Sequence, residues 1–390
     1  MNIIKLYMLN FLTSLHFFGA VTVPFFLYWG GLNFKQIFFL QAIYSIAVFL
    51  FEIPTGVLAD KYSRKLSIIL GTICYATAMI IFAFSTNYYF YIFSELIGAF
   101  GFTLMSGADS AIFYDSLKDK SLEKDARYYY SRRSIAGSFG QIVGLISGGV
   151  VAGSKFLPYP QMIPMTFLLT GIVFVVSMVV AMTLKEPPRK EKVKHPLKES
   201  IEGFKYIFKN KHLFIFSLNF LLISSVTFFM FWFYQKLAEN IGIPLTYYGV
   251  LGASFSIFSI IVLLRIKKLE ELFGIRNLIT FTAVVPGILF ISLIFIKGYF
   301  LLIPIILIPV MRIVRQPIFE DFMNKHIDSR RRATVLSSVN MLQRLVISVI
   351  YVIVGFLADI SLNITFLVLG VIALIFSFIS RIEAKHIGQT

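Results

Sequence analysis

Six acidic or arginine side chains lie well inside long apolar runs, where a charge is costly and marks a functional position by default. They are three acids and three arginines: Glu52, Glu95, Asp109, Arg312, Arg315 and Arg344. A carboxyl group in apolar surroundings can take up and release a proton, because desolvation disfavours its charged form. Arginine stays charged and binds carboxylates or phosphates through paired hydrogen bonds. The chemistry on offer is proton transfer and the binding of charged groups.

The spacing of two acids places them on one helix face. Glu95 and Asp109 are 14 residues apart, which on a helix leaves them within about 40° of each other and about 21 Å apart. Phe102 and Ser106 lie between them on that stripe. Glu95 has no basic neighbour in its own run, so we expect it to carry a coupling proton or to bind a cationic substrate. Asp109 and Glu52 are the alternatives for that role.

Polar residues near the arginines also recur at helical spacing. Arg312, Gln316 and Glu320 follow at i, i+4 and i+8, and Asn340 and Arg344 share a face of the next apolar run. We expect six residues to line a substrate cavity: His16, Arg312, Arg315, Gln316, Asn340 and Arg344. The alternative is that the charges form static pairs between helices and that His16 only packs.

The elements that must position these residues are membrane-spanning helices. Apolar residues make up 57% of the 390 residues and charged residues only 14%, whereas soluble proteins carry roughly 25% charged residues. The runs are continuous, which excludes the alternating pattern of a membrane β-barrel. An all-α polytopic membrane protein is predicted, with twelve spans near 6–29, 37–58, 66–86, 89–113, 133–153, 162–184, 213–235, 247–266, 276–296, 299–322, 333–357 and 362–381.

Basic residues accumulate on one side of these spans. With the N-terminus in the cytoplasm, cytoplasmic segments hold 29 of the 36 Lys and Arg, and outer loops hold 4. This asymmetry is the positive-inside signal, and it explains the net charge of +16 through anionic lipid rather than nucleic acid. We expect a multi-pass protein of a bacterial or archaeal plasma membrane, monomeric, with both termini cytoplasmic.

The longest loop divides the spans six and six. It predicts a half at 1–184, a linker at 185–212 with an amphipathic helix at the cytoplasmic interface, and a half at 213–390. The halves repeat weakly at an offset of 206, which aligns Asp115 with Asp321 and Asp109 with Arg315. A parallel repeat of six helices is typical of secondary transporters. The alignment also suggests that Arg315 pairs with Asp109 and keeps it ionised.

The loop after the second span carries a family motif. Residues 56–65 read GVLADKYSRK, which resembles the G-x-L-A-D-R-x-G-R-K signature of the major facilitator superfamily, with Lys61 and Ser63 as departures. We expect Gly56 to let helices approach closely. The resemblance implies that Asp60, Arg64 and Asp115 form a cytoplasmic charge relay that latches one state of the transporter. The alternative is a solvated basic turn that only fixes topology.

The fifth span carries closely spaced glycines. Residues 140–149 read GQIVGLISGG, which resembles the antiporter motif of the same superfamily, g-x-x-x-G-P-x-x-G-G, with Leu145 in place of the proline. Small residues at this spacing also predict a tight helix-packing face without any role in export. The packing residues are Gly140, Gly144, Gly148 and Gly149.

The expected function is secondary active transport by alternating access, as proton-coupled export of a small amphipathic compound. The rival within the class is an importer or uniporter of a polar or anionic metabolite, which the three membrane arginines favour. The rival of another class is a non-transporting membrane receptor or a membrane-embedded enzyme. The sequence contains no phosphate loop, metalloprotease motif or serine-nucleophile motif, and Cys74 is the single cysteine. No enzyme activity, cofactor or metal is expected.

Overall fold

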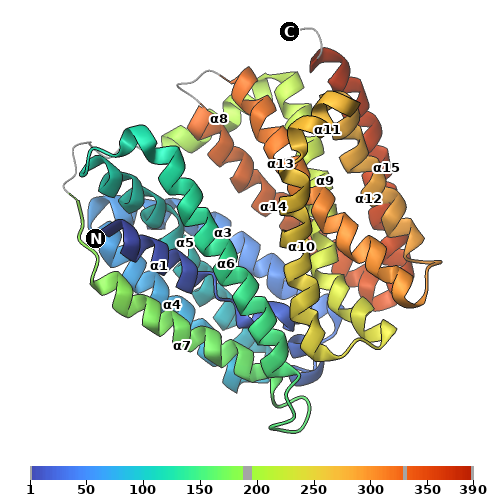
Figure 1. Cartoon of the computed structure of the whole chain (residues 1–390), viewed down its shortest axis with the longest axis horizontal. Coiled ribbons are helices and arrows are strands. Elements are labelled where there is room, and N and C mark those ends of the chain that lie inside the picture. Colours follow the sequence, from blue (N-terminus) through green and yellow to red (C-terminus); the bar gives the residue numbers. More distant parts are fainter. Residues whose placement is uncertain (1, 188–195, 328–331, 388–390) are drawn as a thin grey trace. The chain divides into compact units, whose positions relative to one another are not determined.

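The computed structural model describes residues 2–187, 196–327 and 332–387, and within these ranges every regular element is a helix. The long helices of the N-terminal half lie side by side, with α4 against both α5 and α7 (Figure 1). Side chains cap two of them: Ser63 accepts from the Leu66 N–H at the start of α4, and Asn87 accepts from Tyr89 at the start of α5. The bounds are α3 Phe34–Lys61, α4 Arg64–Phe84, α5 Tyr88–Lys118, η3 Glu123–Asp125, α6 Ala126–Ala152 and α7 Ile163–Met182.

The first predicted span is not one continuous helix. The α-helix ends at Thr13, and the chain then passes through short turns of other helical types. The backbone N–H of Phe17, freed by this break, donates to the Thr170 hydroxyl on α7 at 3.2 Å. The pieces are α1 Asn2–Thr13, η1 Phe17–Ala20, α2 Thr22–Pro24 and the π-helix η2 Phe25–Trp29.

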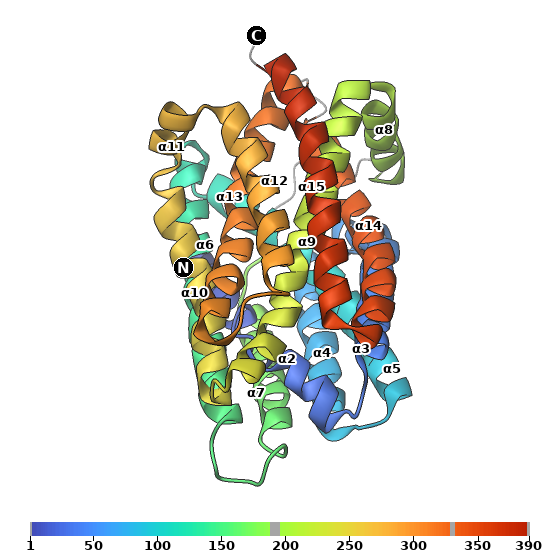
Figure 2. The same cartoon turned by 90° about the vertical axis from the view of Figure 1, so that its right-hand side faces the viewer.

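The C-terminal half is also helical, and α12 lies beside α15 in both views (Figures 1 and 2). The linker contains the predicted amphipathic helix as α8, Pro196–Lys209. The loop expected between the eighth and ninth spans is helical as well, as α11, Ile266–Phe273. The remaining elements are α9 Lys211–Ile241, η4 Leu245–Tyr247, α10 Tyr248–Leu263, α12 Ile275–Ser292, η5 Gly298–Leu301, α13 Leu302–His326, α14 Arg332–Ile360 and α15 Leu362–Ile387.

The number of spans is close to the twelve predicted. Ten helical segments of the described chain are long and apolar enough to cross a membrane, and α11 with α12 makes an eleventh if the bent pair counts as one span. A shorter apolar helix over Leu362–Phe378 covers the last predicted position. The chain is therefore an all-α polytopic membrane protein.

The helices form two compact units, each with its own apolar core. The first comprises Met1–Asn33, Leu40–Pro196 and Pro244–Ala253, and the second comprises Phe34–Phe39, Leu197–Ile243 and Ser254–Thr390. The division falls inside α3 and α10, so each unit includes the first turns of a helix that continues in the other. In the second unit, for example, the Phe38 ring packs edge-on against Phe229 and Trp232 of α9.

Candidate functional site

Three charged residues of the signature loop and of α5 come together as the sequence predicts. The Arg64 guanidinium forms an ion pair with Asp115 near the end of α5 and a second one, at 3.3 Å, with Asp60 on α3. Arg64 is the first residue of α4, so this single side chain links three helices. The side chains are 20–39% exposed, which makes the cluster accessible to water and sensitive to charge changes.

A fourth charged group belongs to the same cluster. The Glu186 carboxylate, which follows α7, accepts from the Arg64 backbone N–H at 2.9 Å and from the Ser63 hydroxyl. It therefore lies at the N-terminus of α4, where unpaired N–H groups favour an anion. The expectation for Gly56 is wrong: among the described atoms, none lies within 4 Å of where its Cβ would be. Within the first unit, Gly56 is therefore not a point of close helix approach.

The glycines of α6 are a packing face for the broken first span. A Cβ on Gly140 would come within 2.3 Å of the Phe11 carbonyl oxygen, and one on Gly148 within 1.9 Å of the Phe17 oxygen. One on Gly144 would be 2.8 Å from the backbone nitrogen of His16. Gly149 faces elsewhere and approaches the backbone of Thr246. Only glycine allows these backbones so close together.

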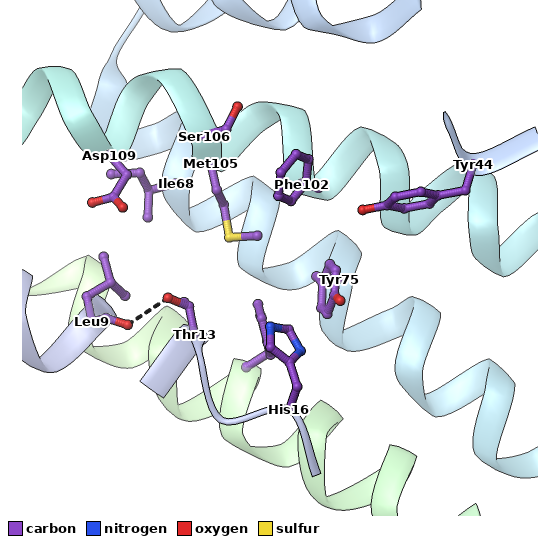
Figure 3. Close-up of a pocket in the computed structure, with 11 residues that line it drawn as sticks. Leu9, Thr13, His16, Tyr44, Ile68, Tyr75, Phe102, Met105, Ser106 and Asp109 are labelled. Carbon is purple, nitrogen blue, oxygen red and sulfur yellow. Dashed lines mark hydrogen bonds between the residues drawn. The ribbon is translucent and has the colours of Figure 1, made fainter. Parts of the chain in front are cut away.

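The first unit contains a cavity of about 250 Å³ beside this break. Figure 3 shows Asp109 toward one end of it, and Tyr44 and Tyr75 toward the other, with His16 below Tyr75. The Phe102–Ser106–Asp109 stripe of α5 forms one wall, as its spacing predicts. The lining residues come from α1 and the break, α3, α4, α5 and α7: Leu9, Thr13, His16, Tyr44, Ile68, Tyr75, Phe102, Met105, Ser106, Asp109 and Phe174.

Glu95 lies on the same helix as that wall but outside the cavity lining. Its side chain is 7% exposed, and its Oε1 accepts from the Gln41 amide at 2.8 Å. The described residues contain no ion pair to Glu95. The neutral Gln41 amide is thus the group that binds this acid. The sequence indicates no basic neighbour for Glu95 within its own helix, and the described residues contain none at ion-pair distance.

Asp109 has a different partner from the one expected. Its Oδ2 forms an ion pair with Arg133 of α6, so the pairing with Arg315 is wrong. The repeat aligned Asp109 with Arg315 by residue number. Arg133 reaches Asp109 because the first turns of α6 lie near the last turns of α5, where Tyr130 also contacts Phe113. Arg133 also lies 5.0 Å from the centre of the Phe113 ring. The other carboxylate oxygen, Oδ1, is buried and has no hydrogen-bond partner among the described residues.

Two arginines of α13 are held by neutral groups in the second unit. Arg315 is 3% exposed and donates to the Ile279 carbonyl at 2.9 Å, to the Thr282 hydroxyl at 3.1 Å and to the Asn219 amide oxygen. Arg312 donates to the Ser224 carbonyl at 3.3 Å and lies over the Phe228 ring. Within the described ranges, neither arginine has a carboxylate at ion-pair distance.

The other predicted cavity residues are more peripheral. Gln316 is exposed and donates to Glu320 one turn later at 2.8 Å. Asn340 on α14 is exposed, and Arg344 is half-buried and interacts with other residues. Glu52 of α3 is half-buried and also has interactions. His16 lines the cavity with its ring against three aromatic residues, namely Phe18, Tyr75 and Phe174.

Sequence reasoning missed several residues that the fold brings to these sites. Arg133 carried a usable signal, because a second basic residue at the start of a span is costly without a partner. Tyr75 and Phe174 carried none, since aromatic residues are frequent throughout the apolar runs. Among the described residues, no group of three or more His, Cys, Asp or Glu side chains could hold a metal ion.

One comparison with known proteins shows the family, and another shows the fold. The model of the Major Facilitator Superfamily matches residues 6–351. The nucleoside transporter NupG is similar in structure, with a TM-score of 0.80 and 16% identity, over 98% of this chain and 99% of that one. No curated protein sequence matches.

Two further solved structures show the same fold. A bacterial homologue of the human lysosomal transporter Spinster, in an inward-facing and occupied conformation, has a TM-score of 0.78 and 14% identity, over 98% of this chain and 96% of that one. The peptide transporter POT, in complex with sulfate, has a TM-score of 0.74 and 13% identity, over 100% and 95%. At these identities the likeness concerns the fold.

Proposed function

Because the chain belongs to the Major Facilitator Superfamily, a family of secondary transporters, we propose that it exports a small amphipathic compound in exchange for protons. It works by alternating access in the plasma membrane, as a monomer with both termini in the cytoplasm. The observation that carries the proposal is the setting of Glu95. This acid is buried within a span, and its hydrogen-bond partner among the described residues is the neutral Gln41 amide. A group in this setting binds and releases a proton as its surroundings change.

The cavity of the first unit supports an amphipathic substrate. Aromatic side chains such as Tyr44, Phe102 and Phe174 make up much of its lining, and Asp109 adds one charged group. Ligand sites in proteins are commonly apolar with a few placed polar groups. Phe102 and Asp109 are on the same helix as Glu95, so a small shift of α5 moves the substrate wall and the proton site together.

The Asp60–Arg64–Asp115 cluster acts as the gate in this proposal. Arg64 holds α3 and α5 against the start of α4 through two ion pairs. Breaking either pair frees helix ends on the cytoplasmic side. The contacts of Glu186 with Ser63 and with the Arg64 backbone add the segment after α7 to the gate.

A second candidate is import or uniport of a metabolite with an anionic group. It is favoured by Arg312 and Arg315, two mostly buried cations that lack a carboxylate partner in the described chain. A buried guanidinium held by neutral groups keeps its charge available to a carboxylate or phosphate. This candidate needs no proton-binding acid inside the membrane, so the effect of replacing Glu95 on transport distinguishes the two candidates.

The test uses purified full-length protein in liposomes that contain a trapped pH dye. Wild-type protein is challenged with amphipathic dyes, ethidium and rhodamine 6G, and separately with anions, benzoate and glycerol 3-phosphate. We expect proton movement with the amphipathic dyes. Glu95→Gln, which imitates the protonated acid, should abolish that movement yet still permit exchange of labelled ethidium between the two sides.

The matched control is Asp359→Asn, which neutralises an exposed acid at the far end of α14 and should leave proton movement unchanged. Full gradient-driven transport by Glu95→Gln would move the coupling role to Asp109 or Glu52. If replacing all three acids leaves it intact, proton coupling through a membrane carboxylate is refuted. Uptake of labelled anions without proton movement, together with no response to the dyes, would replace export with the second candidate.

A further inference from the structure

The helix α3 belongs to both compact units. The division falls between Phe39 and Leu40, and the helix runs through it without interruption. Phe38 lies on the side of the second unit and Gln41 on the side of the first, about 4.5 Å apart along the helix axis. Because the backbone hydrogen bonds of a helix keep so short a separation nearly constant, a displacement of Phe38 also displaces Gln41.

The second unit holds the first turns of α3 firmly. The Phe38 side chain has no exposed surface. The centre of its ring lies 5.4 Å from that of Phe229 and 5.8 Å from that of Tyr351. The α14 backbone is also close, because a Cβ on Gly355 would be 3.1 Å from the Cβ of Phe38. The first turns of α3 therefore move with α9 and α14.

In the first unit, Glu95 belongs to a tightly packed pair of helices. A Cβ on Gly71 of α4 would be 2.7 Å from the Gly101 carbonyl oxygen of α5. The Ser67 hydroxyl of α4 donates to the Leu104 carbonyl oxygen of α5 at 2.7 Å. The position of Glu95 is thus fixed by α4, whereas its hydrogen-bond donor lies on α3.

The hydrogen bond between α3 and α5 is sensitive to small shifts. Nε2 of Gln41 donates to Oε1 of Glu95 at 2.8 Å, and such a bond is lost at separations beyond about 3.5 Å. A displacement of α3 against α5 by about 1 Å therefore breaks it. A donor to a carboxyl oxygen stabilises the ionised acid, so loss of the donor favours the protonated acid.

The other titratable groups around Glu95 are two tyrosines and, next to them, a histidine. Tyr75 of α4 interacts electrostatically with Glu95 and with Tyr44 of α3, and His16 meets the Tyr75 ring edge-on. Both phenols are neutral at physiological pH, because tyrosine titrates at about pH 10. Among the described residues, no basic side chain lies at ion-pair distance from Glu95. Gln41 is therefore the described polar group that donates to the acid.

We propose that Gln41 is the positioning residue of the proton site, and that the second unit sets its position through Phe38. With the first turns of α3 seated as observed, the amide donates to Glu95 and the acid is ionised. When alternating access moves the second unit, α3 shifts against α5, the bond breaks, and Glu95 takes up a proton from the water on the side then open. The return movement restores the bond and releases the proton to the water on the opposite side. This inference rests on the proposed function, in which Glu95 carries the proton.

The test follows the protonation of Glu95 by infrared spectroscopy of the full-length protein in nanodiscs. The carboxyl band of the protonated acid is assigned by its loss in Glu95→Gln and is titrated against pH. Gln41→Met keeps the length of the side chain but lacks the donor, and it should raise the pH of half-protonation by about one unit or more. The matched control, Gln161→Met, alters an exposed glutamine before α7 and should leave the titration unchanged.

A double-mutant cycle tests the role of the second unit. Phe38→Leu removes the ring contacts of the first turns of α3, and it should shift the titration of Glu95 in the same direction as Gln41→Met, by a smaller amount. In the Gln41→Met background it should add no further shift, because the coupling runs through the amide. The control is Phe319→Leu, which removes a buried ring of the second unit that stacks on Phe220 and should not move the titration. Circular dichroism and size-exclusion profiles matching the wild type establish that each variant is folded.

Several outcomes overturn the proposal. An unchanged titration in Gln41→Met refutes the positioning role, as does the absence of any carboxyl band that Glu95→Gln removes. A Phe38→Leu variant without a shift, or with one that persists in the Gln41→Met background, refutes the role of the second unit.

Gradient-driven transport of ethidium separates this inference from the proposed function. If Glu95→Gln keeps full transport while Gln41→Met shifts the titration, the positioning role stands and the export proposal falls. If transport requires Glu95 but the titration is indifferent to Gln41, the export proposal stands and the positioning role falls.

Discussion

Replacing Gly148 by alanine tests whether α6 is shaped around the broken first span. The new Cβ would lie 1.9 Å from the Phe17 carbonyl oxygen and 2.7 Å from its carbonyl carbon, whereas real Cβ atoms keep at least 3.0 Å. Because both neighbours are backbone atoms, no side-chain rotation relieves the clash. The backbone of Phe17 must move by about 1 Å or more.

The cost follows from three contributions. Overpacking of this kind costs about 1–3 kcal/mol. The displacement also strains the 3.2 Å hydrogen bond from the Phe17 N–H to Thr170, worth about 1 kcal/mol. Alanine has a higher helix propensity than glycine, which offsets about 1 kcal/mol of this cost. We therefore expect Gly148→Ala to lower the free energy of unfolding by about 1–3 kcal/mol.

The assay is a denaturant titration of the purified protein in mixed micelles, followed by tryptophan fluorescence. Gly107→Ala is the matched control, because Gly107 lies mid-helix in α5 and none of the described atoms is within 4 Å of its Cβ position. That variant should be as stable as the wild type or up to about 1 kcal/mol more stable. Equal stability of the two alanine variants would refute the packing argument.

Three further predictions concern the charged clusters. Asp60→Asn should strongly reduce transport while leaving membrane insertion and stability intact, as measured by dye efflux and by expression; wild-type efflux would contradict the gate. Arg133→Gln should destabilise by about 3–5 kcal/mol because Asp109 is left as a buried unpaired charge, and adding Asp109→Asn should recover much of that loss in the same titration. Glu186→Gln should lower the thermal unfolding temperature by only a few degrees, since Ser63 still caps α4, but should slow transport; an unchanged rate would exclude Glu186 from the gate.

The helical spans could be predicted because the bilayer leaves few choices. A backbone in hydrocarbon must satisfy its own hydrogen bonds, so length and hydropathy suffice to locate α4 or α7. The break after Thr13 could not be predicted, because the three residues at which the α-helix stops, Ser14, Leu15 and His16, include neither glycine nor proline. The break depends on the glycine face of α6 and on the Thr170 hydroxyl. That hydroxyl accepts a hydrogen bond from the Phe17 N–H, which lies 153 residues earlier in the chain.

The charged cluster at Arg64 was predictable and the pair at Asp109 was not. The signature loop is a local pattern, and its arginine reaches Asp115 because α4 and α5 are neighbours along the chain. Asp109 could be matched to any of several buried arginines, and the sequence repeat favoured Arg315. Nearness in space favoured Arg133, 24 residues away, because the first turns of α6 lie near the end of α5. The Gln41 amide against Glu95 likewise depends on how α3 and α5 pack.

The broken first span also has a consequence for biosynthesis. Its apolar window has a mean hydropathy of 1.2, the lowest among the candidate spans, which range up to 2.4. When this segment leaves the ribosome, the glycine face of α6 and the hydroxyl of Thr170 have not been made. At about 5–20 residues per second, those 153 residues take about 8–30 seconds. Until then nothing holds the segment broken, and a continuous helix satisfies the Phe17 N–H internally, so the break forms only after the fifth and sixth spans have been made.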